Sequence, residues 1–365
     1  MNRGRRRGIS KGEYILRRIL IILGAVLAVV VILIAAGKIV TILGRNRLEK
    51  NASSEGPTMT EQVDPAIKEK YVSQWKEGWV SLDDKIYEYN DEIRTFLILG
   101  IDNAHKGGDK KFDELTDGGQ ADGIFLVVID PTDRSMKVLA VNRDTDVDVV
   151  MVGIGENGDD VIAPAEISVQ HAFGGGKEYS CELTRDAVSK LLYNVPIHAY
   201  MSVNYKAIPK INDAIGGVTI TMPEDYSAIN KAWTQGSEVT LKGEDAYDFV
   251  HLRDTKVFES QRQRLSRQKV YLKAFIRQMR IKTKENITLP VSLYGELKDY
   301  IVTDLTVDTM GYMASEYVDY SFDEDAIYTM EGETELGADG FEHFYPDEEA
   351  LRRLVIELFY KEVAQ

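Results

Sequence analysis

Cysteine is almost absent from this 365-residue chain, because Cys181 is its single copy. One thiol cannot close an intrachain disulfide, so the fold must depend on a hydrophobic core. A domain of about 300 residues is long enough to bury such a core without cross-links. For an exported domain, the lack of disulfides is more typical of a Gram-positive-type cell surface than of a eukaryotic secreted protein.

Positive charge is outnumbered beyond residue 50, where 33 Lys and Arg stand against 57 Asp and Glu. The whole chain has a net charge of −15, whereas residues 1–50 hold 11 Lys and Arg against 2 Asp and Glu, which leaves −24 for residues 51–365. A surface this acidic binds polyanions poorly. Nucleic acid is therefore not an expected partner. Any phosphate that this part recognises needs a local group of Arg or Lys, or a metal ion.

One long apolar run is present, ILIILGAVLAVVVILIAAG at residues 19–37. As a helix it would extend for about 28 Å, close to the hydrocarbon thickness of a bilayer. A cleavable signal peptide is the main alternative, but its apolar part usually has about 7–15 residues. Seven Lys and Arg precede the run and four follow it, which places the N-terminus inside. We expect a cytoplasmic tail (1–18), a transmembrane helix (19–40) and an extracellular main domain at the cell membrane.

The segment between the membrane and the main domain, residues 41–90, is expected to hold a polar linker and an amphipathic helix. Five large apolar side chains recur within residues 67–90 at helical spacing: Tyr71, Trp75, Trp79, Leu82 and Ile86. Spacings of three and four place side chains on one face of a helix. We interpret this face as a packing surface.

The main domain, residues 91–285, alternates strands with helices. TFLILGID, ADGIFLVVID and MKVLAVNRD contain almost continuous apolar runs, typical of strands that are buried on both faces. The last two flank the turn PTDRS and predict a hairpin. The expected class is therefore α/β, a central mixed sheet covered by helices on both sides. Residues 286–365 are expected to form a C-terminal α/β extension.

Two aspartates stand at the ends of predicted strands. Asp102 closes the first strand and Asp122 opens the second. Sheets of this class place ligands at strand ends, and carboxylates are the ligands that Mg²⁺ prefers. Spacing alone equally fits two aspartates that cap turns, so both interpretations stay open at this point.

Cationic side chains form a second group of candidates. Arg143 and Asp144 follow the third strand, and an arginine fork fixed at its base binds phosphate through two parallel hydrogen bonds. Four side chains share one face of the helix expected at 259–283: Arg264, Arg267, Gln268 and Tyr271. Arg253 precedes this helix. Cations gathered in an acidic domain suggest an anionic ligand, whereas a salt-bridged surface is the alternative.

Taken in order, these segments resemble the LytR–CpsA–Psr family of cell-envelope proteins. The resemblance covers about residues 94–283. It is carried by FLILGID, QADGIFLVVID, MKVLAVNRDT, EISVQHAFGGG, VPIHAYMSVNYKAIPKINDAIGGVTITMPEDY, LKGEDAYDFVHLRD and RLSRQKV.

The resemblance implies a transferase that moves a phosphate-linked glycan from a polyprenyl-pyrophosphate carrier to peptidoglycan or to a protein. The carrier's lipid would occupy a groove in the apolar core. Asp102 and Asp122 would hold Mg²⁺, and Asp122 or Asp144 would accept the proton of the acceptor hydroxyl. Pyrophosphate binding would fall to Arg143, Arg253, Arg264, Arg267 and Gln268. Such catalysis depends on positioning and charge stabilisation.

The chain departs from the family pattern at several polar positions. They are Ala104, Gln120, Asn142, Glu166, Ser168, Thr255 and Gln261. Several of these changes remove a cation, and each charged hydrogen bond contributes about 1.5–3 kcal/mol. Arg262 and Lys256 are candidate replacements. A second function therefore stays open, that of a divergent member that binds polyprenyl-linked glycans or the wall with little catalysis, as an assembly or regulatory factor.

Overall fold

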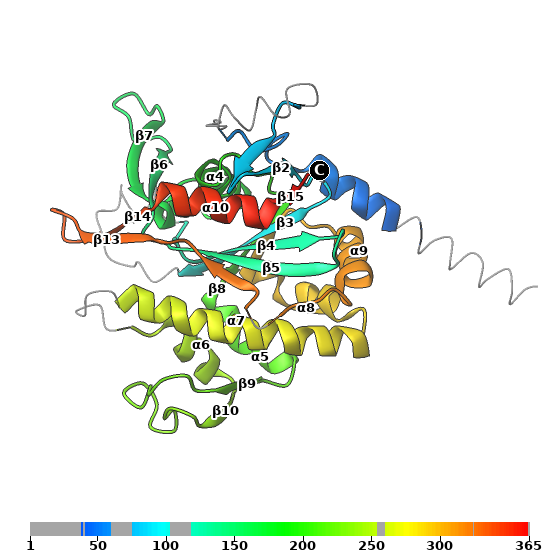
Figure 1. Cartoon of the computed structure of the whole chain (residues 1–365). Helices are drawn as coiled ribbons and strands as arrows, with labels where there is room; N and C mark the ends of the chain where they lie inside the picture. The colour runs from blue at the N-terminus through cyan, green and yellow to red at the C-terminus, as the bar shows by residue number, and fades with distance from the viewer. Residues whose placement is uncertain are drawn as a thin grey trace, which may run out of the picture.

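A six-stranded mixed sheet forms the centre of the computed structural model (Figure 1). The structure describes residues 38, 41–59, 75–102, 118–253, 260–323 and 325–363. The sheet order is β11 (Ile301–Thr303), β8 (Ala199–Asn204), β3 (Arg94–Asp102), β4 (Gln120–Asp130), β5 (Ser135–Val141) and β12 (Ile327–Thr329). β3 pairs in parallel with β8, and β12 with β5, while the other pairs are antiparallel.

Helices cover both faces of this sheet, as the apolar strands require. On one face α4 (Glu178–Leu191) and α10 (Glu348–Phe359) pack against side chains such as Leu97 and Leu126. On the other face α7 (Ser260–Glu285) and α9 (Val307–Tyr317) contact the alternate strand positions, among them Phe96 and Phe125. Figure 1 shows α10 and α7 on opposite sides of β4 and β5. The predicted α/β class and the hairpin of β4 with β5 are confirmed.

A third core joins the far side of α7 to a small subdomain. It contains α5 (Ile208–Ala214), β9 (Val218–Thr221), β10 (Glu238–Leu241) and α6 (Glu244–His251). Trp233 and Phe249 are fully buried at its centre and contact each other edge to face. This core holds α6 against α7, which fixes the position of His251 at the C-terminal end of α6.

The prediction of a helix within residues 67–90 is wrong for the part that the structure describes, residues 75–90. Val80–Leu82 and Lys85–Tyr89 form the hairpin β1–β2, while residues 60–74 lie outside the described part. Asp83 and Asp84 have φ of 48° and 62°, the conformation that a two-residue hairpin turn needs. β15 (Tyr360–Glu362) pairs with the other edge of β2. Strand pairing with a distant segment therefore overrides the helical spacing.

Residues 286–365 contribute directly to the central fold. They supply β11 and β12 to the sheet, and Val355 and Phe359 of α10 to the core beside α4. They also include α8 (Leu289–Leu297) and the hairpin of β13 (Gly332–Leu336) with β14 (Glu342–Pro346). A second hairpin, β6 (Asp146–Met151) with β7 (Val161–Glu166), follows β5 in the chain.

The apolar run at 19–37 lies outside the described residues. In the part of the chain that the structure describes, no helix combines the length and apolarity that crossing a bilayer requires.

The hairpin β13–β14 is fastened to β6 by His343. The imidazole Nδ1 lies 2.7 Å from Oδ1 of Asp146, and Nε2 lies 3.2 Å from Oδ2 of Asp339 in the hairpin turn. The hydrogen bond with Asp146, helped by Asp339, raises the pKa of His343 to about 9.

We expect the stability that His343 adds to depend on pH. A folded-state pKa above the ordinary value means that the imidazolium stabilises the fold. This contribution is therefore complete below about pH 6.5 and lost as the pH rises through about 9. Thermal unfolding of wild type and His343→Asn between pH 6 and 10 should show a difference in Tm that shrinks as the pH rises. A difference that stays constant would contradict the assignment.

Candidate functional site

A β-bulge directs Asp122 out of the sheet's regular pairing. Gly100 of β3 pairs with Gly123 of β4, but Ile101 pairs with Ala121, so Asp122 has no partner on β3. Bulges of this kind re-aim a side chain and are common beside functional sites. The carboxylate of Asp122 is buried, with 7% of its side chain exposed.

Arg143 follows β5 and reaches back to the bulge. Its Nη1 donates to Oδ1 of Asp122, and its Nη2 donates to Oε1 of Gln120 at 2.9 Å and to Oγ of Ser168 at 2.8 Å. Nε lies 3.1 Å from Oδ1 of Asp144. Gln120 and Ser168 are two of the positions that depart from the family pattern. In this chain both hold the guanidinium of Arg143 in place.

Arg264 completes this group from the opposite direction. It lies in the first half of α7, and its Nη1 donates to Oδ2 of Asp122 at 3.0 Å. Only 3% of its side chain is exposed. Its Nε and Nη2 are buried and have no hydrogen-bond partner among the described residues. Because an unpaired buried donor is costly, these N–H groups indicate the place of an anionic oxygen.

The charges in this group shift each other's proton affinities. Burial would raise the pKa of Asp122, but Arg143 and Arg264 outweigh it and hold that pKa below its ordinary value. For Asp144, burial prevails over Arg143 and raises the pKa. Burial and the neighbouring Arg264 and Arg143 lower the pKa of Arg253, which places Arg253 in the same cationic group. Asp122 is thus kept ionised, whereas Asp144 binds a proton more readily.

Asp102 and Asp122 lie close enough together to bind one metal ion. One ligand atom from each of Asp102, Asp122 and His251 fits within a span of 4.8 Å. His251 Nε2 lies 3.0 Å from Oδ2 of Asp102, and its ring stacks on Tyr247 at 4.7 Å. Two carboxylates fit Mg²⁺, with water and phosphate oxygens as further ligands. Beside such an ion, the contact of His251 with Asp102 would orient that carboxylate.

Arg267 and Gln268 share the face of α7 with Arg264, but their side chains turn to α6. Arg267 donates through Nε to the carbonyl oxygen of Phe249 at 2.9 Å and through Nη2 to that of Leu252. Gln268 Nε2 donates to the carbonyl oxygen of Val250 at 3.2 Å. Both side chains therefore satisfy carbonyl groups at the C-terminal end of α6 and hold His251 beside Asp102.

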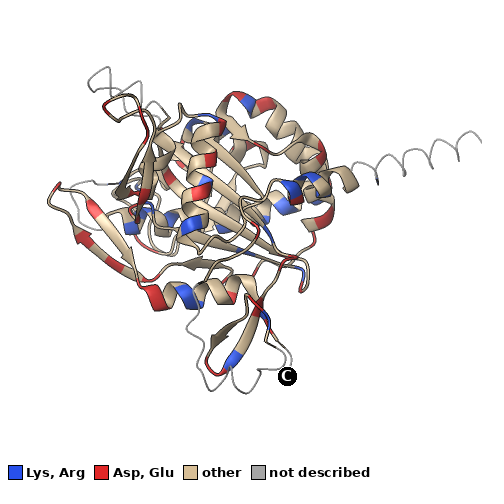
Figure 2. Ribbon diagram, turned by 90° about the horizontal axis from the view of Figure 1, so that it is seen from above, with Lys and Arg blue, Asp and Glu red and all other residues tan. Residues whose placement is uncertain are grey.

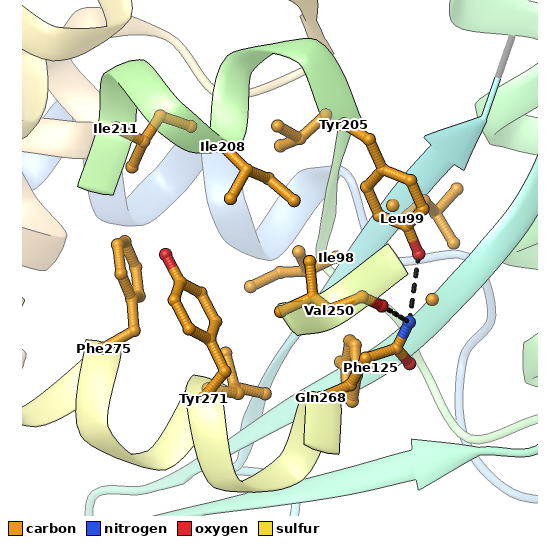
Figure 3. A pocket seen from close by; sticks show the side chains of 14 residues that line it. Ile98, Leu99, Phe125, Tyr205, Ile208, Ile211, Val250, Gln268, Tyr271 and Phe275 are labelled. Carbon is orange, nitrogen blue, oxygen red and sulfur yellow. Dashed lines mark hydrogen bonds between the residues drawn. The ribbon is translucent and has the colours of Figure 1, made fainter. Parts of the chain in front are cut away.

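An apolar pocket of about 150 Å³ opens next to this group (Figure 3). Its walls come from β3, β4 and β8 on one side and from η2 (Tyr205–Ala207), α5, α6 and α7 on the other. The side chains that line it include Ile98, Phe125, Ile208, Leu272 and Phe275. Gly100 and Gly123 also line the pocket, and both adjoin the bulge at Asp122. The pocket therefore leads from the apolar core to the charged group.

Tyr205 sits at the boundary between the pocket and the charged group. An added Cβ at Gly100 would lie 2.5 Å from its ring, so glycine is required there. The hydroxyl of Tyr205 accepts a hydrogen bond from Nε2 of Gln268 at 3.2 Å. Neither Tyr205 nor His251 was among the predicted site residues. The nearest signal was their position in the matched segments VNYKAI and DFVHLRD.

Known proteins are similar to this chain in sequence. Residues 50–358 match a family model described as the LytR_cpsA_psr family. The chain is 26% identical over 309 residues to a Bacillus cereus protein named polyisoprenyl-teichoic acid–peptidoglycan teichoic acid transferase TagU, and the match covers 84% of this chain and 88% of that protein.

Solved structures share the fold at lower identity. TagV of B. subtilis has a TM-score of 0.54 and 23% identity, covering 73% of this chain and 96% of that one. The protein gbs0355 of Streptococcus agalactiae has a TM-score of 0.56 and 18% identity, covering 73% and 86%. At these identities the likeness concerns the fold alone.

Proposed function

The chain belongs to the LytR–CpsA–Psr family, and on this premise we propose that it transfers a phosphate-linked glycopolymer from a polyprenyl-pyrophosphate carrier to peptidoglycan at the cell surface. The matched protein of Bacillus cereus is named for such a transfer of teichoic acid. The glycopolymer of this chain is proposed only as a class, a phosphate-linked glycan.

The observation that carries this proposal is that two buried nitrogens of Arg264, Nε and Nη2, have no hydrogen-bond partner among the residues that the structure describes. Arg143 and Arg253 lie close by, so three guanidinium groups gather around Asp122 and Asp144. A pyrophosphate bridging these arginines would satisfy the open donors through charge-assisted hydrogen bonds. The adjoining apolar pocket suits the first part of the carrier's lipid chain.

In the proposed reaction, a sugar hydroxyl oxygen of the acceptor attacks the phosphorus that carries the glycan. The bond from that phosphorus to the bridging oxygen breaks, and polyprenyl phosphate leaves. Arg143 and Arg264 stabilise the negative charge on the phosphate oxygens. Asp144 accepts the hydroxyl proton, since its raised pKa and its position beside Arg143 suit a base.

We propose that Asp102 and Asp122 bind Mg²⁺, which would neutralise charge on the pyrophosphate. Arg267 and Gln268, assigned to the pyrophosphate by the family resemblance, are bonded to the end of α6. We therefore place them as positioning residues that hold α6 and His251. Arg253, at the end of the described segment before α7, is proposed as the third pyrophosphate ligand.

A second candidate function is the binding of polyprenyl-linked glycan with little transfer. The observation that favours it is the loss of cations, because Gln120 and Glu166 stand where family members have basic residues. Gln120 and Ser168 instead position Arg143. The guanidinium of Arg143 is thereby ordered, which favours the transferase.

A transfer assay separates these two functions. The full-length chain in detergent would be mixed with Mg²⁺, a polyprenyl-pyrophosphate glycan and soluble peptidoglycan oligomers, and products would be identified by mass spectrometry. We expect glycopolymer linked to peptidoglycan through a phosphodiester, with polyprenyl phosphate released. If the protein binds the lipid but forms no product even at high protein concentration, the transferase proposal is contradicted and the binding function is supported.

A further inference from the structure

A second hollow, which is polar, borders α7 at Gln261 to Lys269, whereas the apolar pocket borders the same helix at Gln268 to Phe275. The polar hollow has a volume of about 880 Å³. Its walls are the side of α7 that carries Gln261, Ser266 and Lys269, the end of β5, and the start of the hairpin β13–β14. We call it the polar cleft. It also contains Arg262, Leu265, Glu331, Glu333, Thr334 and Phe344.

We propose that the polar cleft binds the acceptor, a peptidoglycan saccharide strand, during transfer. This inference rests on the proposed function and names the subsite of its second substrate. The cleft lines up amide, hydroxyl and charged groups of both signs beside apolar surface from Leu265 and Phe344. Saccharides carry hydroxyl and amide groups around the edge of a ring whose C–H face is apolar. A cleft with both polar and apolar walls therefore suits them.

The position of the cleft fits an acceptor. Asn142, which lines it, accepts a hydrogen bond through Oδ1 from the backbone N–H of Asp144 at 3.0 Å. Phe344, which also lines it, donates its backbone N–H to the carbonyl oxygen of Asp144 at 2.7 Å. Two lining residues of the cleft thus contact the backbone of Asp144. Asp144 is the carboxylate that is proposed to accept the proton of the attacking hydroxyl.

The cleft offers no excess of positive charge to the other saccharide in the reaction, the phosphate-rich donor polymer. Its two carboxylates, Glu331 and Glu333, offset its two cations, Arg262 and Lys269. The hairpin β13–β14 carries further acidic residues along its length (Figure 2). A polyphosphate chain therefore gains little electrostatic attraction here, whereas a strand without phosphates does not need it.

One buried group also points to a missing ligand in the cleft. Gln261 lines it, is only 2% exposed, and its Oε1 has no hydrogen-bond partner among the described residues. An amide oxygen left unpaired in a buried position is costly. A hydroxyl or amide N–H of a bound saccharide would supply the donor that it lacks.

The test compares two tryptophan variants on exposed positions of α7. Ser266→Trp places a large ring in the polar cleft, whereas Gln263→Trp is a matched control, because Gln263 is exposed on the same helix and lines neither hollow. For the full-length chain, Ser266→Trp should raise KM for peptidoglycan oligomers about tenfold or more. KM for the lipid-linked donor should stay within about twofold, and Gln263→Trp should change neither.

Direct binding of peptidoglycan oligosaccharides, measured without donor, separates this inference from the proposed function. Wild type and Gln263→Trp should bind, and Ser266→Trp should bind about tenfold more weakly. This result would stand even if no transfer product forms. Equal binding by both variants, or a rise in donor KM alone with Ser266→Trp, would overturn the acceptor assignment.

Discussion

Asp122→Asn should both destabilise the protein and abolish transfer. The carboxylate of Asp122 bonds to Arg143 and Arg264, and all three side chains are almost fully buried. Asparagine keeps the shape but removes the counter-charge of Arg264 and one of the two carboxylates, Asp122 and Asp144, that neutralise Arg143. Removing one partner of a buried ion pair costs about 3–5 kcal/mol. The transfer rate should also fall at least about 10²–10³-fold, as for loss of one preorganised electrostatic group.

Urea unfolding and the transfer assay would measure the two effects, with transfer measured where circular dichroism shows the variant folded. Asp186→Asn is the matched control, because Asp186 is 51% exposed and pairs with Arg185 at the surface. Exposed ion pairs contribute about 0–1 kcal/mol. An Asp122→Asn protein as active as the control would contradict the role of Asp122.

The second large effect is expected from filling the apolar pocket. Ile208 lines it together with Phe125 and Phe275, so Ile208→Trp should occupy the space proposed for the carrier's lipid (Figure 3). Each methylene kept out of an apolar site costs about 0.8 kcal/mol. KM for long-chain donors should therefore rise about tenfold or more, while a donor with a very short chain reacts almost as in wild type.

Ile287→Trp controls for the added ring, because Ile287 is 48% exposed and does not line the pocket. Overpacking can itself cost about 1–3 kcal/mol, so thermal unfolding of both variants would accompany the kinetics. If folded Ile208→Trp raises KM equally for long-chain and short-chain donors, the pocket does not hold the lipid.

The strands that carry the site were predictable because their apolar runs are long and almost continuous. Asp102, Asp122 and Arg143 stand where these runs begin or end, so adjacent strands bring them together. The bulge at Asp122 was not predictable, because it depends on the pairing register between β3 and β4. The contact of Arg264 with Asp122 spans 142 positions in sequence, which local patterns do not encode.

Helical spacing correctly predicted which side chains share one face of α7, but it did not predict what each of them contacts. Arg264, Arg267 and Gln268 do share one side of α7, yet only Arg264 meets Asp122. The other two reach the end of α6, whose free carbonyl groups accept from them. His251 stands alone in sequence, with no pattern to mark it, and gains its place beside Asp102 only through the packing of α6 on α7.

The measurement that tests the account most directly is the initial rate of glycopolymer transfer by wild type, Arg143→Ala and Arg353→Ala. Arg143 contacts Asp122 and lies 3.1 Å from Asp144, whereas Arg353 is 45% exposed and pairs with Asp83 and Glu349 on the surface. We predict a rate at least about 10²-fold lower for folded Arg143→Ala, with Arg353→Ala close to wild type. Equal rates for the three proteins would contradict the assignment of Arg143 and its neighbours as the site of transfer.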